Sequence, residues 1–461
     1  MTTNTDQVEV RAGVYHDSVS LMRVSQALGS RPGVSVAIVA MATELNVGLA
    51  REVGFEVPAA GPADLLVAIR AESAEELAAA GEELERQFAG LGRAARDGGG
   101  AAAAHAPRTT RAAAKVFDAT LALVSTPGDH AFTEAMDAVE AGLSVMIFSD
   151  NMPLEQEIAL KERAAERGVL VMGPDCGTAV VSGAGLGFAN VLSPGPVGVV
   201  AASGTGAQQV TCLLDHAGAG VSHVLGVGGR DLSAAVGGRS TLVALRALDA
   251  DPSTELIVLI SKPPAPEVAE LVRRAVEELS TPVVGALLGP GQDDLTTAVE
   301  KALHALGRPV PRWPSWTLPQ RPRTAGLCGL YSGGTLCAEA KLIAGTGEFT
   351  DFGDDEYTRG RPHPMIDPAM RLEALSRTSG VILLDVVLGH AADPDPAARL
   401  APAVRAAGER GASVVAALVG TDADPQGLRH QAEALHQAGA SVFVSNAAAA
   451  RHAASLIASA P

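Results

Sequence analysis

Two turns in the sequence combine glycine with hydroxyl side chains in the way that anion sites do. Each lies between a short apolar run and a run of small residues, in the segments 196–218 and 324–347. A helix N-terminus leaves N–H groups unpaired and carries about half a positive charge. Glycine lets an anion approach this backbone closely, and Ser or Thr adds further donors. The residues that we expect to bind phosphate are therefore Ser203, Gly204, Thr205, Gly206, Ser332, Gly333, Gly334 and Thr335.

The alternative is that both segments are ordinary strand-to-helix turns. Neither has the lysine of a Walker loop or the spacing GxGxxG, so the sequence does not indicate nucleotide binding. The turns nevertheless occupy equivalent places in an internal repeat with an offset of about 130 residues. In that repeat ELIVLI (255–260) resembles GVILLDV (380–386), and PVVGALLG (282–289) resembles SVVAALVG (413–420). The repeat predicts two doubly wound α/β domains that face each other, with one phosphate-like anion between their helix ends.

Charged residues at strand ends are candidates for chemistry beside that anion. Lys262 and Asp385 each end an apolar strand, which is the edge where ligands bind in α/β folds. Asp385 has the alternative role of capping a helix. Asp175 follows another strand end, and its neighbour Cys176 is expected to be structural because nothing nearby would activate a thiolate.

The segment 351–371 is the densest polar cluster in the chain. Its arginines are suited to hold a carboxylate substrate, since a guanidinium fork matches a carboxylate. The alternative is a surface loop with its own turns and ion pairs. From these patterns we assign catalysis to Lys262, Asp385, His363 and Arg361, and substrate binding to Asp175 and Arg371 in addition to the two turns.

The order of strands and helices predicts an α/β fold. Near the N-terminus, strands at 8–15, 34–41 and 64–71 alternate with helices at 17–30, 43–54 and 71–90. From Phe117 onward, continuous apolar strands alternate with amphipathic helices, which indicates parallel sheets covered on both faces. We expect a small ferredoxin- or ACT-like α+β domain (1–93), an Ala/Gly-rich linker (94–115), a Rossmann-like segment (116–192), a flavodoxin-like domain (193–306), a Pro-rich linker (307–323) and a second flavodoxin-like domain (324–461).

Composition excludes several functional classes. The 461 residues carry a formal net charge of −17, which disfavours binding to nucleic acid. No uncharged apolar run is long enough to span a bilayer, and the first residues do not form a signal peptide. The four cysteines have neither a disulfide pattern nor a zinc-binding spacing, so no metal site is expected. We expect a soluble, cytoplasmic protein.

Several motifs are similar to those of succinyl-CoA synthetase. The segments GVLVMGPDCGTAV, VGVVAASGTGAQQV, HVLGVGGRDLS and DPSTELIVLISKPP resemble its α subunit, and residues 324–461 resemble the C-terminal domain of its β subunit. This order, behind a small extra domain, resembles the FdrA family. The motifs that carry that resemblance are GLYSGGTLCAEA, DFGDDEYTRGRPHPMIDPAMR, LLDVVLGHAADP and GTDADPQ followed by VSNAAAA.

The sequence departs from the synthetase at the positions that carry its chemistry. The loop that holds its phosphorylated histidine reads ALLGPGQDDLTTA (286–298) here and contains no histidine. Lys262 stands where the synthetase has a Gly-Glu pair, and no ATP-grasp module is present. The Gly-rich turn that binds CoA has no counterpart before residue 117. CoA is therefore not expected as a ligand.

The resemblance to FdrA implies a subunit of an oxamate carbamoyltransferase of purine (allantoin) catabolism. Its reaction converts oxalurate and phosphate to oxamate and carbamoyl phosphate. The implied partners are a DUF1116-family protein and a further carbamoyltransferase subunit, with a carbamate kinase downstream. No cofactor is required for this chemistry beyond a set of preorganised donors around the phosphate. An acyl-CoA synthetase subunit and a non-catalytic scaffold or regulatory subunit remain as alternatives, and a homo-oligomer is left open.

Overall fold

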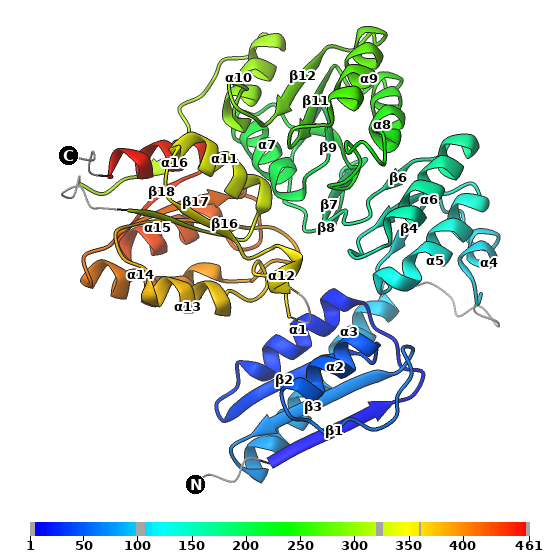
Figure 1. The fold of residues 1–461 in the computed structure, drawn as a ribbon, viewed down its shortest axis with the longest axis vertical. Helices are drawn as coiled ribbons and strands as arrows, with labels where there is room; N and C mark the ends of the chain where they lie inside the picture. The colour runs from blue at the N-terminus through cyan, green and yellow to red at the C-terminus, as the bar shows by residue number, and fades with distance from the viewer. Residues whose placement is uncertain (1–4, 98–106, 320–325, 359–360, 458–461) are drawn as a thin grey trace. The chain divides into compact units, whose positions relative to one another are not determined.

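The computed structural model describes residues 5–97, 107–319, 326–358 and 361–457 (Figure 1). The chain divides into two compact units, Met1–Arg108 with Asp355–Pro362, and Thr109–Asp354 with His363–Pro461. Parts of both predicted linkers, residues 98–106 and 320–323, lie outside the described residues.

The first unit is a three-stranded antiparallel sheet with strand order β1-β3-β2. Its elements are β1 (Thr5–Arg11), α1 (Ser18–Gly29), β2 (Val34–Met41), α2 (Glu44–Glu52), β3 (Leu65–Ala71), α3 (Ala74–Asp97) and the short α12 (Asp355–Thr358). Asp17 caps α1 through the N–H of Ser20, and Thr43 caps α2 through the N–H of Asn46. Leucines and valines of α1, β2 and β3 form a core with α3 on one face of the sheet.

Two boundaries in this unit differ from those predicted. Strand β1 ends at Arg11 rather than at residue 15, because Gly13 adopts a left-handed φ of 66° and donates its N–H to Asp64. Helix α3 continues to Asp97, inside the predicted linker, because the Ala and Arg residues after position 92 favour a helix.

The second unit begins with a parallel three-stranded sheet of order β4-β5-β6. It contains α4 (Thr110–Ala114), β4 (Leu121–Val124), α5 (Gly128–Glu140), β5 (Ser144–Ile147), α6 (Leu154–Arg167) and β6 (Val171–Met172). Alanines of α5 and the inward side chains of β4 and β5 form its core. The arrangement is Rossmann-like as predicted, but it ends at β6, because residues 178–187 of the predicted segment 116–192 form strands of the next sheet.

The two remaining sheets have six strands each, and their parallel strands follow the same order. In the first, β12-β11-β9-β10-β7-β8, the strands are β7 (Thr178–Val181), β8 (Ala184–Gly187), β9 (Pro194–Ala201), β10 (Val221–Gly226), β11 (Leu256–Ser261) and β12 (Val283–Leu287). In the second, β13-β18-β17-β16-β14-β15, they are β13 (Ser315–Trp316), β14 (Leu327–Tyr331), β15 (Glu348–Asp351), β16 (Val381–Val387), β17 (Ser413–Val419) and β18 (Ala440–Phe443). Strands β9 and β14 occupy the same place, each between the second and third parallel strands of its domain. The flavodoxin-like order predicted from the repeat is therefore confirmed.

The helices of these two domains alternate with their strands. The first domain contains α7 (Gly204–His216), α8 (Arg239–Asp249), α9 (Pro266–Glu277) and α10 (Leu295–Ala305). The second contains α11 (Gly334–Ala344), α13 (Ala369–Arg377), α14 (Pro396–Glu409), α15 (Leu428–Gln437) and α16 (Asn446–Ser455). The two domains meet along α7, α10, α11 and α16, and α7 lies beside α11 in Figure 1.

Buried polar side chains cross this boundary in matching pairs. The side chain of Gln209 on α7 accepts a hydrogen bond from the first N–H of α16, that of Asn446, at 2.8 Å. In the same way Glu339 on α11 accepts from the first N–H of α10, that of Leu295, at 2.6 Å. Each domain therefore caps a helix of the other, which fixes the relative position of α7 and α11. Burial raises the pKa of Glu339 to about 7.

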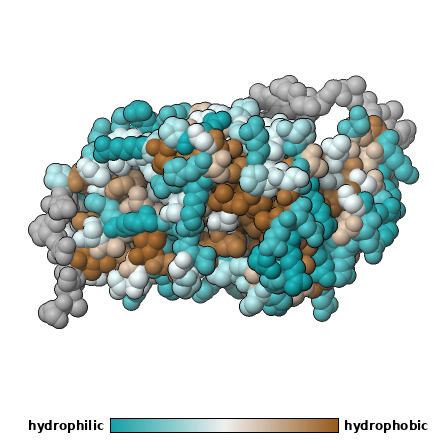
Figure 2. Space-filling view, turned by 90° about the horizontal axis from the view of Figure 1, so that it is seen from above, coloured by the Kyte–Doolittle hydropathy of each residue, from teal (hydrophilic) through white to brown (hydrophobic). Residues whose placement is uncertain are grey.

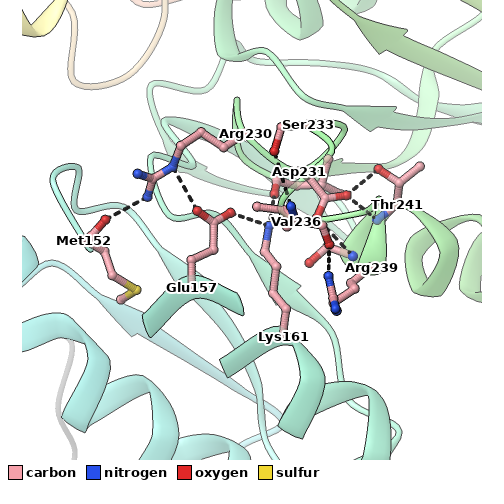
Figure 3. Close-up of polar contacts among 11 residues, drawn as sticks. Met152, Glu157, Lys161, Arg230, Asp231, Ser233, Val236, Arg239 and Thr241 are labelled. Carbon is pink, nitrogen blue, oxygen red and sulfur yellow. Dashed lines mark hydrogen bonds and ion pairs between the residues drawn. The ribbon is translucent and has the colours of Figure 1, made fainter. Parts of the chain in front are cut away.

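A buried ion cluster joins the Rossmann-like segment to the loop after β10 (Figure 3). Lys161 on α6 donates to Glu157 at 2.9 Å and to Asp231 at 2.8 Å, and all three side chains are at most 1% exposed. Asp231 also accepts from the N–H and hydroxyl of Thr241, at the start of α8. Arg230 pairs with the second carboxylate oxygen of Glu157 at 2.9 Å. The cluster therefore fixes the loop 227–240 against α6.

Hydrophobic residues reach the surface in several places among hydrophilic ones on the face shown in Figure 2. None of the described helices has both the length and the apolar character that spanning a bilayer requires.

Candidate functional site

The N-termini of α7 and α11 meet at the boundary between the two flavodoxin-like domains. The hydroxyl of Ser203, the N-cap of α7, accepts from the N–H of Gly206 at 2.9 Å and donates to the hydroxyl of Thr335 at 2.6 Å. Gly333, the N-cap of α11, lies against Thr205, because a β-carbon at Gly333 would come within 2.7 Å of the Thr205 side chain. The predicted encounter of the two helix ends is therefore present.

Unpaired backbone donors remain at this junction. Within the described parts of the chain, no hydrogen bond engages the N–H groups of Gly204 and Thr205 on α7, or of Gly334 and Thr335 on α11. Ser203, Gly204 and Gly334 keep partial exposure to solvent. Two helix dipoles therefore direct positive potential at a place that a solute can reach.

The close approach at Gly333 gives a test of this geometry. We expect Gly333→Ala to destabilise the protein by about 1–3 kcal/mol, because the added methyl group overlaps Thr205 and pushes the helix ends apart. Phosphate binding should weaken with it. The matched control is Gly48→Ala in α2, where a β-carbon meets nothing within 4 Å. Gly48→Ala should raise the free energy of unfolding by up to about 1 kcal/mol. Equal melting temperatures for Gly333→Ala and the wild type would contradict the arrangement.

Asp385 is a buried cap of α11 and not an accessible catalytic group. Its side chain is fully buried and accepts from the N–H and hydroxyl of Ser332, at 2.8 and 2.9 Å, and from the N–H of Gly333 at 2.9 Å. Burial raises its pKa, while Arg371 opposes that rise. The donors of Ser332 and Gly333 are consequently engaged by the protein itself.

Arg371 neutralises this carboxylate instead of lining a surface for substrate. It pairs with Asp385 at 3.1 Å, donates to the carbonyl of Leu330 at 3.2 Å, and is 4% exposed. Arg371 and Arg361 belong to different units, so the expectation that they hold a substrate together stays a prediction. Arg361 is exposed and belongs to the first unit, whereas Arg371 lies within the core of the second. The Nε of Arg371 is buried without an acceptor among the described residues.

Lys262 lies beside the N-terminal end of α11, and His363 lies near Gly353. The Nζ of Lys262 is 3.6 Å from the place that a β-carbon of Gly334 would take. His363 accepts from the N–H of Met365 at 3.2 Å through Nδ1, and its ring stacks near Phe188 with centroids 5.6 Å apart. Burial, together with the charge of Arg371, lowers the pKa of His363 to about 4. His363 is therefore neutral at physiological pH.

The sequence analysis missed Asp351, the last residue of β15. One carboxylate oxygen of Asp351 lies against Gly334, and the other accepts from the N–H of Gly353 at 2.9 Å. Burial raises the pKa of Asp351 to about 6, and Lys262 opposes this rise. The only signal for Asp351 in the sequence was an acidic residue at the end of a strand. That strand, β15, pairs in parallel with the Gly-rich strand β14.

The two remaining residues, Asp175 and Cys176, follow β6. Asp175 is exposed, with a left-handed φ of 57°, and follows β6 in the three-stranded sheet rather than either of the sheets whose helices meet. Cys176 is buried, and burial raises its pKa to about 12, so it is a structural thiol as expected.

The loop 288–294 follows β12, in the place of the synthetase's histidine loop. It lines a cleft of about 440 Å³ together with Glu339, Leu342, Ile343 and Arg451. Asp294 in this loop caps α10 through the N–H of Thr297 at 2.8 Å. The loop contains no residue that can form a phosphohistidine.

Two family models match the chain. One is described as "AllF, heavy metal-associated domain" and matches residues 1–106. The other is described as "CoA-ligase" and matches residues 330–456.

The first description raises the question of a heavy-metal site. Such ions favour thiolate ligands, but the first 106 residues contain no cysteine. His16 stacks on Phe88 with ring centroids 5.0 Å apart. Across the described residues, no group of three His, Cys, Asp or Glu side chains is placed to hold a metal ion. The residues of this domain do not fit a heavy metal.

Similar proteins include subunits of CoA ligases. The α subunit 2 of succinate–CoA ligase (ADP-forming) from Archaeoglobus fulgidus is 28% identical over 185 residues, covering 39% of this chain and 63% of the subunit. The malate–CoA ligase α subunit from Methylorubrum extorquens is 28% identical over 189 residues, covering 39% of this chain and 62% of that subunit. The chain thus spans less than two thirds of either subunit.

The solved structures that resemble this chain do so at a distance. Acetyl-coenzyme A synthetase 1 (dinucleotide forming) of Ca. Korarchaeum cryptofilum, in complex with phosphate and ADP, has a TM-score of 0.31 at 17% identity, covering 73% of this chain and 82% of that one. This likeness is too low to support an argument about function.

A much longer match is to YahF of Escherichia coli K12, an uncharacterized protein. It is 36% identical over 501 aligned residues, which cover 94% of this chain and 95% of YahF. The order of parts agrees with the matched models, an AllF-type N-terminal domain followed by a CoA-ligase-like body. The chain therefore belongs to the FdrA-like family that includes YahF.

Proposed function

We propose that this chain binds phosphate or an acyl phosphate between the N-termini of α7 and α11, and that it serves phosphate-dependent carbamoyl transfer. The observation that carries the proposal is the junction at Ser203 and Thr335, where two helix ends meet with unpaired N–H groups on both sides. A phosphoryl group needs such preorganised donors to neutralise the charge on its oxygens. Lys262 supplies an exposed positive charge at the same place.

The absence of a phosphohistidine favours carbamoyl transfer over a ligase cycle. A ligase of the succinyl-CoA synthetase type carries its phosphoryl group on a histidine, and the loop 288–294 has none. Attack of phosphate on a ureido carbonyl needs no such covalent relay, because the phosphate itself accepts the carbamoyl group. The resemblance to FdrA supports oxalurate as the carbamoyl donor. A DUF1116-family protein and a further carbamoyltransferase subunit are then the proposed partners, with carbamate kinase consuming the product.

A second candidate is an acyl-CoA ligase subunit. The match of residues 330–456 to a CoA-ligase model, and the similarity to α subunits of CoA ligases, favour it. In that case the histidine and the nucleotide site would have to come from another chain. This candidate predicts CoA binding, whereas carbamoyl transfer does not.

Thermal melting of the full chain with separate ligands distinguishes the two. A ligand present at about 100 times its dissociation constant stabilises by about 2.7 kcal/mol, which shifts the melting temperature by a few degrees. We expect such shifts with millimolar phosphate and carbamoyl phosphate and none with CoA or ATP. A shift with CoA would favour the ligase subunit, and no shift with any ligand would contradict a phosphate site in this chain.

A further inference from the structure

Asp351 lies beside the N-terminus of α11, and its two carboxylate oxygens have different neighbours. Oδ2 lies against Gly334, at the first turn of α11, where Lys262 also reaches. Oδ1 accepts from the N–H of Gly353 at 2.9 Å. An anion bound by the unpaired N–H groups of Gly334 and Thr335 would therefore lie beside Oδ2.

His363, like Asp351, lies close to Gly353. Its Nε2 and the Oδ1 of Asp351 lie 2.9 and 3.1 Å from the place that a β-carbon of Gly353 would take. Because Nδ1 accepts from Met365, the neutral ring carries its proton on Nε2. His363 is therefore neutral and contributes no positive charge that would keep the carboxylate ionised.

The charges around Asp351 set its affinity for a proton. Burial raises its pKa to about 6, the carboxylates of Asp385 and Asp354 act in the same direction, and Lys262 acts against them. Arg371 and Cys337 complete the titratable groups that interact with it. A carboxylate whose pKa is raised in this way takes up a proton readily when another negative charge arrives beside it.

We propose that Asp351 is the proton-transfer group of this site and that it shares one proton with the bound anion. The inference rests on the proposed phosphate site, because it assigns a role to a carboxylate that would otherwise repel the ligand.

The proton balance of carbamoyl transfer agrees with this role. An oxygen of hydrogen phosphate forms a bond to the carbonyl carbon of the ureido acid, and the bond from that carbon to the amide nitrogen breaks. The proton of the phosphate passes to Asp351, and Asp351 delivers a proton to the leaving nitrogen. The products are carbamoyl phosphate and the free amide, and no proton is gained or lost in the sum.

Sulfate provides a direct test because it mimics phosphate and does not itself titrate near neutral pH. We expect the affinity of the full chain for sulfate, measured by calorimetry, to fall by up to about tenfold per pH unit above pH 6, since the bound state requires a protonated Asp351. In Asp351→Asn the affinity should be nearly independent of pH and, at about pH 8, tighter than in the wild type. In Asp354→Asn the pH dependence should persist but move to lower pH, because the Asp354 carboxylate helps to raise the pKa of Asp351.

The outcomes separate this inference from the phosphate site on which it rests. If neither sulfate nor phosphate binds the wild-type chain, the phosphate site itself is wrong. If both bind and Asp351→Asn keeps the full pH dependence, the site stands and the role of Asp351 is overturned. In a reconstituted carbamoyl-transfer assay, Asp351→Asn should lose turnover while phosphate binding persists, and wild-type turnover by that variant would also overturn the role.

Discussion

Replacing Lys161 by methionine is expected to lower the free energy of unfolding by about 3–5 kcal/mol, among the largest effects of any single substitution in this chain. Lys161 is 2% exposed and holds Glu157 and Asp231 (Figure 3). Methionine has a similar length but no charge, so both carboxylates would remain buried with less compensation. Loss of the cluster would also release the loop 227–240 from α6.

The control for this substitution is Lys301→Met. Lys301 pairs with Asp293 at the surface, where the lysine side chain is 56% exposed, and exposed pairs of this kind contribute about 0–1 kcal/mol. Chemical denaturation of the two variants, together with amide exchange of α6, measures the difference. Equal denaturation midpoints, with unchanged protection of α6, would show that the cluster does not hold the segment in place.

The internal repeat allowed the most specific structural prediction from sequence. Two equivalent strand-to-helix turns implied two domains of one topology, and strands β9 and β14 do occupy the same place in their sheets. The encounter of Ser203 with Thr335 followed from the expectation that the copies face each other. Such patterns are readable because strand order and turn chemistry depend on short segments of sequence.

The chemistry around α11 was harder to predict because it depends on contacts between distant segments. Asp385 was recognised at a strand end, yet only the structure shows it capping Ser332, 53 positions earlier in the chain. Arg371 carries a charge suited to a substrate but is used to neutralise Asp385. Asp351 is the first residue of the polar cluster 351–371, and its only sequence signal is an acidic residue at the end of a strand. The buried ion cluster also joins two segments, because Glu157 and Lys161 lie on α6 and Asp231 follows β10.

The family and the site together narrow the function. Membership of the FdrA-like family and the CoA-ligase match agree with a body derived from CoA ligases. The loop 288–294 of this body contains no histidine. The proposed function accordingly uses phosphate as a reactant and not as a group carried on the protein.

Ser203→Asp is the second substitution with a large expected effect, and it acts on binding rather than on the fold. Aspartate is as good an N-cap as serine, so α7 should remain intact. Its carboxylate would, however, stand between the helix ends, and two unit charges about 4 Å apart repel by about 4 kcal/mol at an effective dielectric constant of about 20. We expect phosphate affinity to fall by at least about a hundredfold.

The matched control is Thr43→Asp, which places the same charge at the N-cap of α2 in the first unit. It should leave phosphate binding unchanged. This comparison also separates a local effect from one of total charge, because both variants add a single negative charge to a chain that already carries −17.

Calorimetric titration of the full chain with phosphate, for the wild type, Ser203→Asp and Thr43→Asp, is the most direct test of a phosphate site between α7 and α11. The account predicts saturable binding to the wild type and to Thr43→Asp, and none that is measurable to Ser203→Asp. Equal binding by all three proteins, or by none of them, would contradict it.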